Sequence, residues 1–418
     1  MNDKQRRIRK FSDLGFGLVL HWGLYSLYER GEWVQYAHNL DIASYKKRIS
    51  DFNAAGFDPQ SIASLARKNG AGFIILTTRH HDGFSLYDTN GLNDFDAPHS
   101  SANRDLIKEF VSACNDEGIL PILYHTTLDW QWNGKTTMEL DNTEFDNYLD
   151  YLYESVEILC SNYGQVGGFI FDGNWSRPDM DCKYDRLYGM IRKHQPDAII
   201  MDNTGLERPG VRDHHEIDAV TFEQHAICEE NITYGDNIAA LRWLTFNDHW
   251  SWSCRDFNFK SGKEIIEGLV QSRRFGAVYT LNMGPLADGS LEEMDLALIN
   301  KIGRWMEIYG DAIRKGRPMN YSCSGKDFLL EDANACRGYY FCHELGIAGL
   351  DNVTRNKKDI SVRKIFKWDR PVHSLHWMDN NEKLKWEDEE DCLAINCTGF
   401  PYGENHVVRV AIIEWYLL

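Results

Sequence analysis

The chain has 418 residues, of which 43% are hydrophobic, and its formal net charge is −18. This length and apolar content exclude a disordered chain and leave room for one large and one small domain, or for two or three ordinary domains. The charge is spread along the chain without a basic block, which argues against nucleic acid and anionic membrane surfaces as partners.

Residues 1–10 are charged and polar and lack the apolar core of a signal peptide. No stretch reaches the roughly 18 apolar residues of a membrane span, so we expect a cytoplasmic protein. Ten cysteines are scattered along the chain without a CxxC pair, which disfavours a zinc ribbon or a thioredoxin-type motif. In a reducing compartment we expect these cysteines to be free thiols, most of them buried.

From about residue 17 to 310, short apolar runs alternate with helical patterns, which is typical of repeated strand–helix units and a parallel sheet. Strands are expected at Gly17–His21, Gly72–Thr78, Leu120–His125, Gly167–Asp172, Ala198–Asp202, Ala219–Phe222, Leu244–Asn247 and Ala277–Asn282. Helices are expected at Pro59–Asn69, Arg104–Glu117, Glu144–Asn162, Lys183–Lys193, Gly262–Arg274 and Leu291–Tyr309.

Eight such strands predict a closed (β/α)8 barrel over residues 1–316, irregular between residues 203 and 260, where no long helical pattern occurs. An open doubly wound sheet is the alternative, but no glycine-rich phosphate loop follows the first strand. After residue 316, short strand-like runs separated by turn residues predict a small antiparallel β-sandwich over residues 317–418. Its strands are expected at Phe328–Leu330, Gly338–Cys342, Ile360–Phe366, Val372–Trp377, Cys392–Asn396 and His406–Ile413.

The segment Gly167–Gly173 carries the strongest indication of chemistry, because an apolar strand pattern ends abruptly at Asp172. Aspartate is depleted in strands, and catalytic side chains of a barrel project from the C-terminal ends of its strands. The alternative for an isolated case is an aspartate that caps the next turn.

Polar or aromatic residues follow almost every expected strand, and they predict a polar, aromatic-walled pocket at one rim of the barrel. They are His21-Trp22, Arg79-His80-His81-Asp82, Tyr124-His125, Asp172, Asn203, Glu223, Asn247, Trp250 and Asn282. Neutral histidine and asparagine both donate and accept hydrogen bonds, as sugar hydroxyls do. Tryptophan offers a flat apolar face to a sugar ring.

Two pairs of adjacent histidines, at 80–81 and 214–215, raise the question of a metal site. Adjacent residues on a strand point to opposite faces, so neighbouring histidines are poorly placed to share one ion. The sequence also lacks an HxH pair after the first strand and a GxSxG elbow. We therefore predict neither a metal nor another cofactor, and no serine nucleophile.

Several motifs occur in order along residues 11–316: Phe16–Ser26, Gly31-Glu32-Trp33, Thr77–Phe84, Leu128-Asp129-Trp130, Phe171-Asp172-Gly173, Asn247–Trp250, Leu281–Pro285 and Asp288-Gly289. In combination they closely resemble the α-L-fucosidases of glycoside hydrolase family 29. The resemblance implies an irregular (β/α)8 barrel followed by a β-sandwich, in agreement with the residue patterns. It also implies a retaining exo-α-L-fucosidase.

In that mechanism Asp172 would attack the anomeric carbon of fucose, and a second carboxylic acid, roughly 5–5.5 Å away, would protonate the leaving oxygen. The candidates for this acid/base are Glu207, Glu216 and Glu223. The segment Glu216–Glu223 resembles the subgroup that acts on α1,3- and α1,4-linked fucose. This resemblance implies Glu216 as the acid/base and Lewis-type branches as the substrate.

The resemblance further implies fucose contacts for His21, Glu32, Trp33, His80, His81 and His125, with Trp250 as a wall of the pocket. Phe171 or Trp250 would receive the methyl group of fucose. The alternatives are a catalytically silent fucose-binding protein, a fucosidase of broad or α1,2/α1,6 preference, and a barrel hydrolase of another sugar. The expected partner is a fucosylated oligosaccharide, and the sequence does not specify an oligomeric state.

Overall fold

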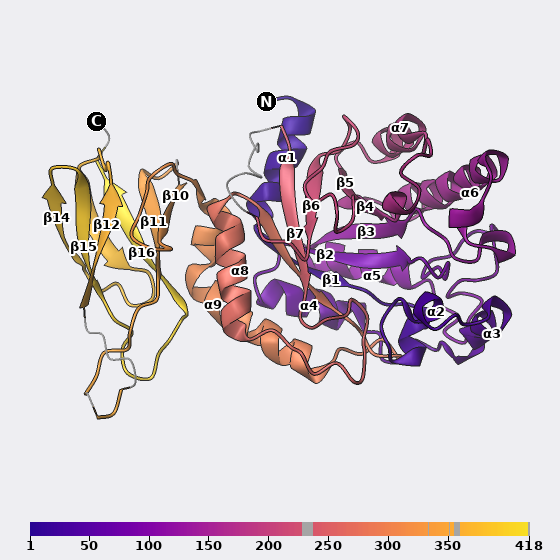
Figure 1. Ribbon diagram of the computed structural model, residues 1–418, viewed down its shortest axis with the longest axis horizontal. Coiled ribbons are helices and arrows are strands. Elements are labelled where there is room, and N and C mark those ends of the chain that lie inside the picture. Colours follow the sequence, from indigo (N-terminus) through magenta and orange to yellow (C-terminus); the bar gives the residue numbers. More distant parts are fainter. Residues whose placement is uncertain (228–236, 333, 351, 355–359, 417–418) are drawn as a thin grey trace. The chain divides into compact units, whose positions relative to one another are not determined.

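The computed structural model describes residues 1–227, 237–332, 334–350, 352–354 and 360–416. The chain forms two compact units, one of residues 1–260 and 278–297 and the other of residues 261–277 and 298–418. The first unit holds a closed barrel, and the second holds two antiparallel sheets (Figure 1). Within the described residues, no helix combines the length and the apolar character that crossing a membrane requires.

Eight parallel strands close the barrel in the order β1 to β8. They are β1 (Phe16–Leu20), β2 (Phe73–Arg79), β3 (Leu120–Thr126), β4 (Gly168–Asp172), β5 (Ile199–Asn203), β6 (Ala219–Glu223), β7 (Ala239–Thr245) and β8 (Val278–Met283). The predicted (β/α)8 barrel is therefore confirmed, and β8 closes it by pairing in parallel with β1.

The seventh strand differs from its prediction. It was expected at Leu244–Asn247, whereas β7 runs from Ala239 to Thr245 and pairs with β6 and β8. Its first residues are two alanines, which have low intrinsic β-propensity, but its inward residues Leu241 and Trp243 fill the barrel core. Asn247 consequently lies in the loop after β7.

The helices have the following bounds: α1 (Asp3–Leu14), α2 (Val34–Ala37), α3 (Ile42–Lys47), α4 (Pro59–Lys68), α5 (Leu106–Glu117), α6 (Asn142–Ser161), α7 (Tyr184–His194), α8 (Gly262–Arg274) and α9 (Glu293–Lys315). All six expected helices form. In the described part of the stretch between residues 203 and 260 there is no helix, as the irregular sequence pattern predicts. Helix α1 was not expected, because its residues are mostly charged; a capping box between Asn2 and Gln5 starts it.

Helix α1 contributes to the interior of the barrel. Its Ile8 and Phe11 join the cluster of inward-facing strand residues, and the rings of Phe11 and Phe73 are 5.3 Å apart. Phe73 is the first residue of β2, so this contact lies at the N-terminal end of the strands. The apolar filling of that end leaves the C-terminal ends of the strands to form a cavity.

The second unit contains a five-stranded sheet, in the order β13-β16-β11-β10-β9, and a three-stranded sheet, in the order β12-β15-β14. Their strands are β9 (Arg317–Pro318), β10 (Phe328–Asp332), β11 (Arg337–His343), β12 (Ile360–Phe366), β13 (Val372–Trp377), β14 (Lys385–Glu389), β15 (Cys392–Thr398) and β16 (Val408–Trp415). One core joins both sheets, for example through Tyr340 and Leu393, which confirms the β-sandwich. The sequence pattern missed β14, whose residues are mostly charged and exposed.

Candidate active site

A cavity of about 680 Å³ opens at the C-terminal ends of the barrel strands. Of the residues predicted from the sequence, it is lined by His21, Glu32, Trp33, His80, His81, Asp172 and Trp250. Glu207 and Glu223 also line it, whereas Glu216 and His125 do not. The fold thus brings together residues that lie more than two hundred positions apart in the sequence.

Asp172 ends β4 and is 8% exposed. Three side chains donate hydrogen bonds to its carboxylate. The hydroxyl of Tyr124 donates to Oδ2 at 2.7 Å, while Trp175 Nε1 and Asn203 Nδ2 donate to Oδ1 at 2.9 and 3.0 Å. Hydrogen bonds to a carboxylate are among the stronger ones in proteins, so these three donors fix the direction of the Asp172 side chain.

The turn after β4 places the side chain of Trp175 beside that of Asp172. Gly173 has a φ angle of 105°, and a Cβ atom there would lie only 2.8 Å from the backbone nitrogen of Leu128. Only glycine fits this close approach without strain. The short 3-10 helix η5 (Asn174–Ser176) follows at once and carries the indole that reaches back to the carboxylate.

Asn203, at the end of β5, links Asp172 to Glu223, at the end of β6. Its Nδ2 donates to Asp172 Oδ1 at 3.0 Å and to Glu223 Oε2 at 2.8 Å. Its Oδ1 accepts from Thr221 Oγ1 at 3.1 Å and from the Gly205 backbone at 3.3 Å, which sets the amide orientation. The two N–H bonds of an amide diverge by about 120°, so the accepting oxygens are about 5 Å apart, as in retaining glycosidases.

Glu223 has the properties of a carboxylic acid that keeps its proton. Burial, followed by the negative charge of Asp172, raises the pKa of Glu223 to about 7. A carboxyl group with this pKa is partly protonated at neutral pH. A protonated carboxyl group at this spacing from a second one suits general acid catalysis beside a nucleophile.

Glu216 lies at the opposite end of β6. It precedes the first strand residue, Ala219, and its carboxylate forms an ion pair with Arg192 at 3.0 Å. Arg192 also binds Asp218, whose carboxylate is bound by Arg7 of α1 at 3.1 Å. Burial raises the pKa of Glu216, but the hydrogen bond and charge of Arg192 outweigh it and hold the pKa below its usual value. The structure therefore does not bring Glu216 to Asp172, and the sequence-based pairing of these two residues is corrected.

His125 is also placed outside the cavity. It is fully buried, and its Nδ1 is 2.8 Å from Thr78 Oγ1. Successive strand residues point to opposite faces, and Tyr124 is the residue of β3 that points inward to Asp172. Phe171 faces away for the same reason, since it precedes Asp172 on β4 and does not line the cavity.

His21 presents an acceptor to the cavity. The amide of Asn282 donates to the backbone carbonyl of Trp250, so its Oδ1 is left to accept from His21 Nδ1 at 2.7 Å. The proton of the neutral ring is thereby assigned to Nδ1, and Nε2 keeps its lone pair. Burial lowers the pKa of His21 to about 4, so the ring is neutral at pH 7 and can accept from a hydroxyl.

The proton of the neutral His81 ring is assigned in the same way. Thr126 Oγ1 donates to the backbone carbonyl of Leu128 at 2.6 Å and therefore accepts from His81 Nδ1, also at 2.6 Å. Burial lowers the pKa of His81 to about 4. Its Nε2 lies 3.7 Å from Asp172 Oδ2, which puts a second neutral acceptor beside the carboxylate.

His80 and His81 both line the cavity, and their ring centroids are 4.1 Å apart. The expectation that adjacent histidines point to opposite faces is wrong here. The pair follows the last residue of β2, Arg79, and the strand pairing is already shifted between Thr77 and Arg79. Alternation holds only inside a regular strand.

Glu32 and the tryptophans form the walls. Glu32 Oε2 accepts from the backbone nitrogens of Trp250 and Ser251 at 3.1 and 2.9 Å. Trp243 and Trp250 lie with their rings 4.9 Å apart, and both line the cavity. These flat apolar surfaces beside hydrogen-bonding groups suit a sugar ring.

Among the described residues, one group of ligand-type side chains is close enough to share a metal ion: Asp185, His214 and His215. None of the three lines the cavity. His214 Nδ1 accepts from the Glu216 backbone at 3.1 Å, and Nε2 lies 3.0 Å from Asp185 Oδ1. Both ring nitrogens of His214 therefore already have protein partners.

A family profile described as alpha-L-fucosidase matches residues 1–311. Tissue alpha-L-fucosidase of Rattus norvegicus is 25% identical over 342 residues, which cover 74% of this chain and 70% of that protein. Alpha-L-fucosidase isoenzyme 1 from Paenibacillus thiaminolyticus is similar in structure, with a TM-score of 0.81, 25% identity and 100% of both chains covered. A Bacteroides thetaiotaomicron GH29 alpha-L-fucosidase, trapped as a covalent intermediate with 2-fluoro-fucosyl fluoride, has the same fold, with a TM-score of 0.80, 19% identity and coverage of 99% and 96%.

Proposed function

Because the chain belongs to the α-L-fucosidase family of glycoside hydrolases, we propose that its cavity releases terminal α-L-fucose from oligosaccharides with retention of configuration. In this proposal Asp172 is the nucleophile and Glu223 is the general acid/base. The observation that carries the proposal is the amide of Asn203, which donates to both carboxylates at 3.0 and 2.8 Å. This spacing leaves no room for an attacking water between the carboxylates and fits a direct displacement.

In the first step, a carboxylate oxygen of Asp172 forms a bond to the anomeric carbon of fucose. The glycosidic C–O bond breaks, and Glu223 gives its proton to the leaving oxygen, which departs as an alcohol. The product is an ester between Asp172 and fucose. The donors Tyr124, Trp175 and Asn203 keep the attacking carboxylate pointed in one direction.

In the second step, the carboxylate of Glu223 takes a proton from a water molecule as that water attacks the anomeric carbon. The ester bond to Asp172 breaks, fucose leaves with its original configuration, and Glu223 is protonated again. A pKa of about 7 for Glu223 suits a group that must donate in one step and accept in the next.

Fucose recognition is assigned to the neutral acceptors His21 and His81, to Glu32, and to the tryptophan walls. The Nε2 atoms of the two histidines would accept from sugar hydroxyls, since their Nδ1 protons are already bound. Fucose carries a methyl group in place of a hydroxymethyl group, and burying it on Trp243 or Trp250 would contribute about 0.8 kcal/mol.

We further propose a preference for α1,3/1,4-linked fucose on Lewis-type branches. The resemblance of the segment Glu216–Glu223 to the subgroup with that preference supports it. A volume of about 680 Å³ also exceeds what one monosaccharide ring fills and is within the range of sites for larger ligands, as a branched acceptor requires. Release of fucose from a Lewis-type trisaccharide, but not from an α1,2-fucosylated one, is the expected result.

The test of the acid/base uses two matched variants. Glu223→Gln should lower kcat/KM for an oligosaccharide by about 10²- to 10⁴-fold, because the poor leaving group needs its proton. An activated aryl fucoside should lose much less in the first step. Glu216→Gln should leave both activities within about two-fold, since this residue is held by Arg192 outside the cavity.

The reverse pattern, with Glu216→Gln impaired and Glu223→Gln active, would return the acid/base role to Glu216. Equal loss on both substrates for Glu223→Gln would mean that the residue acts in binding and not in protonation. If the wild-type protein binds fucose and releases none from either linkage, the protein is a fucose-binding scaffold.

A further inference from the structure

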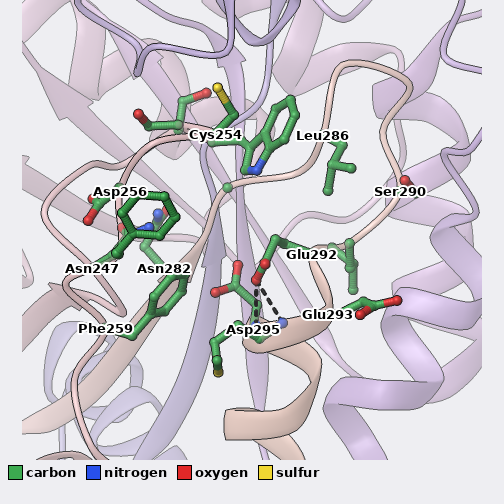
Figure 2. A pocket seen from close by; sticks show the side chains of 17 residues that line it. Asn247, Cys254, Asp256, Phe259, Asn282, Leu286, Ser290, Glu292, Glu293 and Asp295 are labelled. Atoms are coloured by element: carbon green, nitrogen blue, oxygen red, sulfur yellow. Dashed lines mark hydrogen bonds between the residues drawn. The ribbon is translucent and has the colours of Figure 1, made fainter.

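A second cavity, also of about 680 Å³, lies in the barrel unit beside the catalytic one. It is formed by the loops that follow β7 and β8 and by the start of α9. Figure 2 shows Asp256, Phe259, Glu292 and Asp295 around it. No residue of the mechanism proposed above reacts in this space.

One segment separates the two cavities. Asp248 and Trp250 line the catalytic cavity, whereas Asn247, Ser251 and Trp252 line the second one. The backbone N–H groups of Trp250 and Ser251 in this segment donate to the side-chain carboxylate of Glu32, a wall residue of the catalytic cavity. The two cavities therefore lie on the same rim of the barrel, on either side of this one segment.

The second cavity is aromatic and rich in acceptors. Trp252, Phe257 and Phe259 contribute rings, and Phe257 is 87% exposed. These three rings line one cavity, and aromatic side chains grouped in a cavity are typical of ligand-binding sites. The described lining residues include no lysine or arginine, so an anionic ligand is disfavoured.

Two of the carboxylates around the cavity, Asp256 and Glu292, already have hydrogen-bond partners in the protein. Asp256 Oδ2 accepts from the Asp248 backbone at 2.9 Å and lies 2.7 Å from His249 Nδ1. Glu292 Oε2 accepts from the backbone nitrogens of Met294 and Asp295 at 2.7 and 3.1 Å, at the start of α9 (dashed lines in Figure 2). Glu292 also lies at the positive end of the helix dipole of α9.

Asp295 itself is 5% exposed, and burial raises its pKa to about 8. Its carboxyl group is therefore mostly uncharged at pH 7 and can both donate and accept. Asp256 and Glu292 already accept hydrogen bonds from the backbone, and Asp256 also contacts His249, so little of the charge of these two carboxylates is left for a cation. Aromatic faces with hydroxyl-matching groups favour a neutral polyhydroxylated ligand.

We propose that the second cavity is a separate binding site for a neutral sugar residue, of the non-fucosyl class that a fucosylated glycan also carries. The choice of ligand rests on the proposed function, since a fucosidase works among such sugars. Phe257 and Phe259 would contact the C–H face of the ring, and Asp295 and Glu293 would bind its hydroxyls.

The probes are methyl β-galactoside and methyl N-acetyl-β-glucosaminide, titrated into the full-length wild-type protein with and without saturating L-fucose. Binding is measured by saturation-transfer NMR. We expect at least one of the glycosides to bind. Its affinity should be unchanged within two-fold when L-fucose occupies the catalytic cavity. Phe257→Ala should weaken binding by at least about five-fold through loss of the ring contact.

Phe366→Ala is the matched control, because Phe366 is another exposed phenylalanine, 42% accessible, on β12 and outside both cavities. It should leave binding unchanged. Asp295→Asn, which keeps the shape of the side chain, should weaken binding in the same direction as Phe257→Ala.

The proposal is overturned if neither glycoside binds, if L-fucose displaces the bound glycoside, or if Phe257→Ala and Phe366→Ala behave alike. Binding of methylammonium in place of the glycosides would identify a cation site and equally overturn it. Since no turnover is measured, a protein that binds the glycosides but releases no fucose would refute the proposed function and not this site.

Discussion

Asp172 and Glu223 show that the position of a residue along its strand decides whether its carboxyl group reaches the cavity. Both are the last residues of their strands, β4 and β6, and both reach the same amide of Asn203. Glu216 lies before the same strand that Glu223 ends. A strand of this length spans about 15 Å, so the residue at its start cannot reach chemistry at its end.

Replacing Asp172, the proposed nucleophile, tests the mechanism at a single residue. Asp172→Asn removes the charge of the attacking oxygen while keeping the size and planar shape of the side chain, so the first step should stop. We expect kcat to fall by at least about 10³-fold on aryl fucosides as well as on oligosaccharides. Thermal unfolding of the variant should stay within a few degrees of the wild type, which separates loss of chemistry from loss of fold. Residual activity near wild type would exclude Asp172 as the nucleophile.

The pH dependence follows from the pKa of Glu223, which is raised to about 7. The catalytic acid is the protonated form, so it is present well below pH 7 and is lost as the pH rises through about 7. The pKa values of His21 and His81 are about 4, so these rings stay neutral across this range. We expect kcat/KM for an oligosaccharide to fall above pH 7.

Glu223→Gln should abolish that alkaline limb in the residual activity on the same oligosaccharide, measured as kcat/KM from pH 5 to 9. A limb that persists in the variant would belong to another group. The same shift affects stability: because folding raises the pKa of Glu223 from 4.5 to about 7, its contribution to stability is full below about pH 4.5 and is lost as the pH rises from there to about 7.

At the scale of elements, strand parity and strand ends explain the site residues that the sequence missed. Tyr124 and His125 are neighbours on β3. Tyr124 lies two residues after the inward core residue Ile122 and therefore points to the same face of the strand, whereas His125 points to the opposite face. The same parity on β4 selects Asp172 over Phe171. Counting alternation back from the core would have found Tyr124 without a structure.

Helix α1 gives a prediction at this scale. Phe11 packs against Phe73 inside the N-terminal end of the barrel, far from the cavity at the other end. Phe11→Ala should lower the free energy of unfolding by about 3–5 kcal/mol through cavity formation. KM should not change, because the catalytic cavity has no residue of α1 in its lining.

Arg9→Ala, on the exposed side of the same helix, is the control and should unfold at the wild-type denaturant concentration. Denaturation in urea, followed by fluorescence, measures both. If Phe11→Ala were as stable as Arg9→Ala, α1 would not contribute to the barrel core in solution.

At the scale of the whole molecule, the cysteines test how the fold is stabilised. The nine cysteines that the structure describes are all free thiols, and most are buried, as the sequence predicts; the tenth, Cys228, lies outside the described residues. A chain of this size buries enough apolar surface to be stable without cross-links. The cytoplasmic location and the division at residues 316/317 stay predictions.

We therefore expect a reducing agent to leave the melting temperature unchanged within about one degree. Differential scanning calorimetry with and without dithiothreitol measures this. A clear decrease in the reduced sample would reveal a disulfide, whose removal typically costs 2–5 kcal/mol in small secreted domains.

Residue patterns and motifs were enough to predict the barrel, the sandwich, the strand that ends in Asp172 and seven of the residues that line the cavity. These predictions depend on hydrophobic periodicity and on short motifs, which can be recognised from neighbouring residues in the chain. Packing between distant parts of the chain places Glu223 beside Asn203 and Glu216 against Arg192. It also decided the start of β7 and the placement of His80 and His81 on one side. These outcomes depend on where a strand begins and ends, which is set by pairing with neighbours distant in the chain.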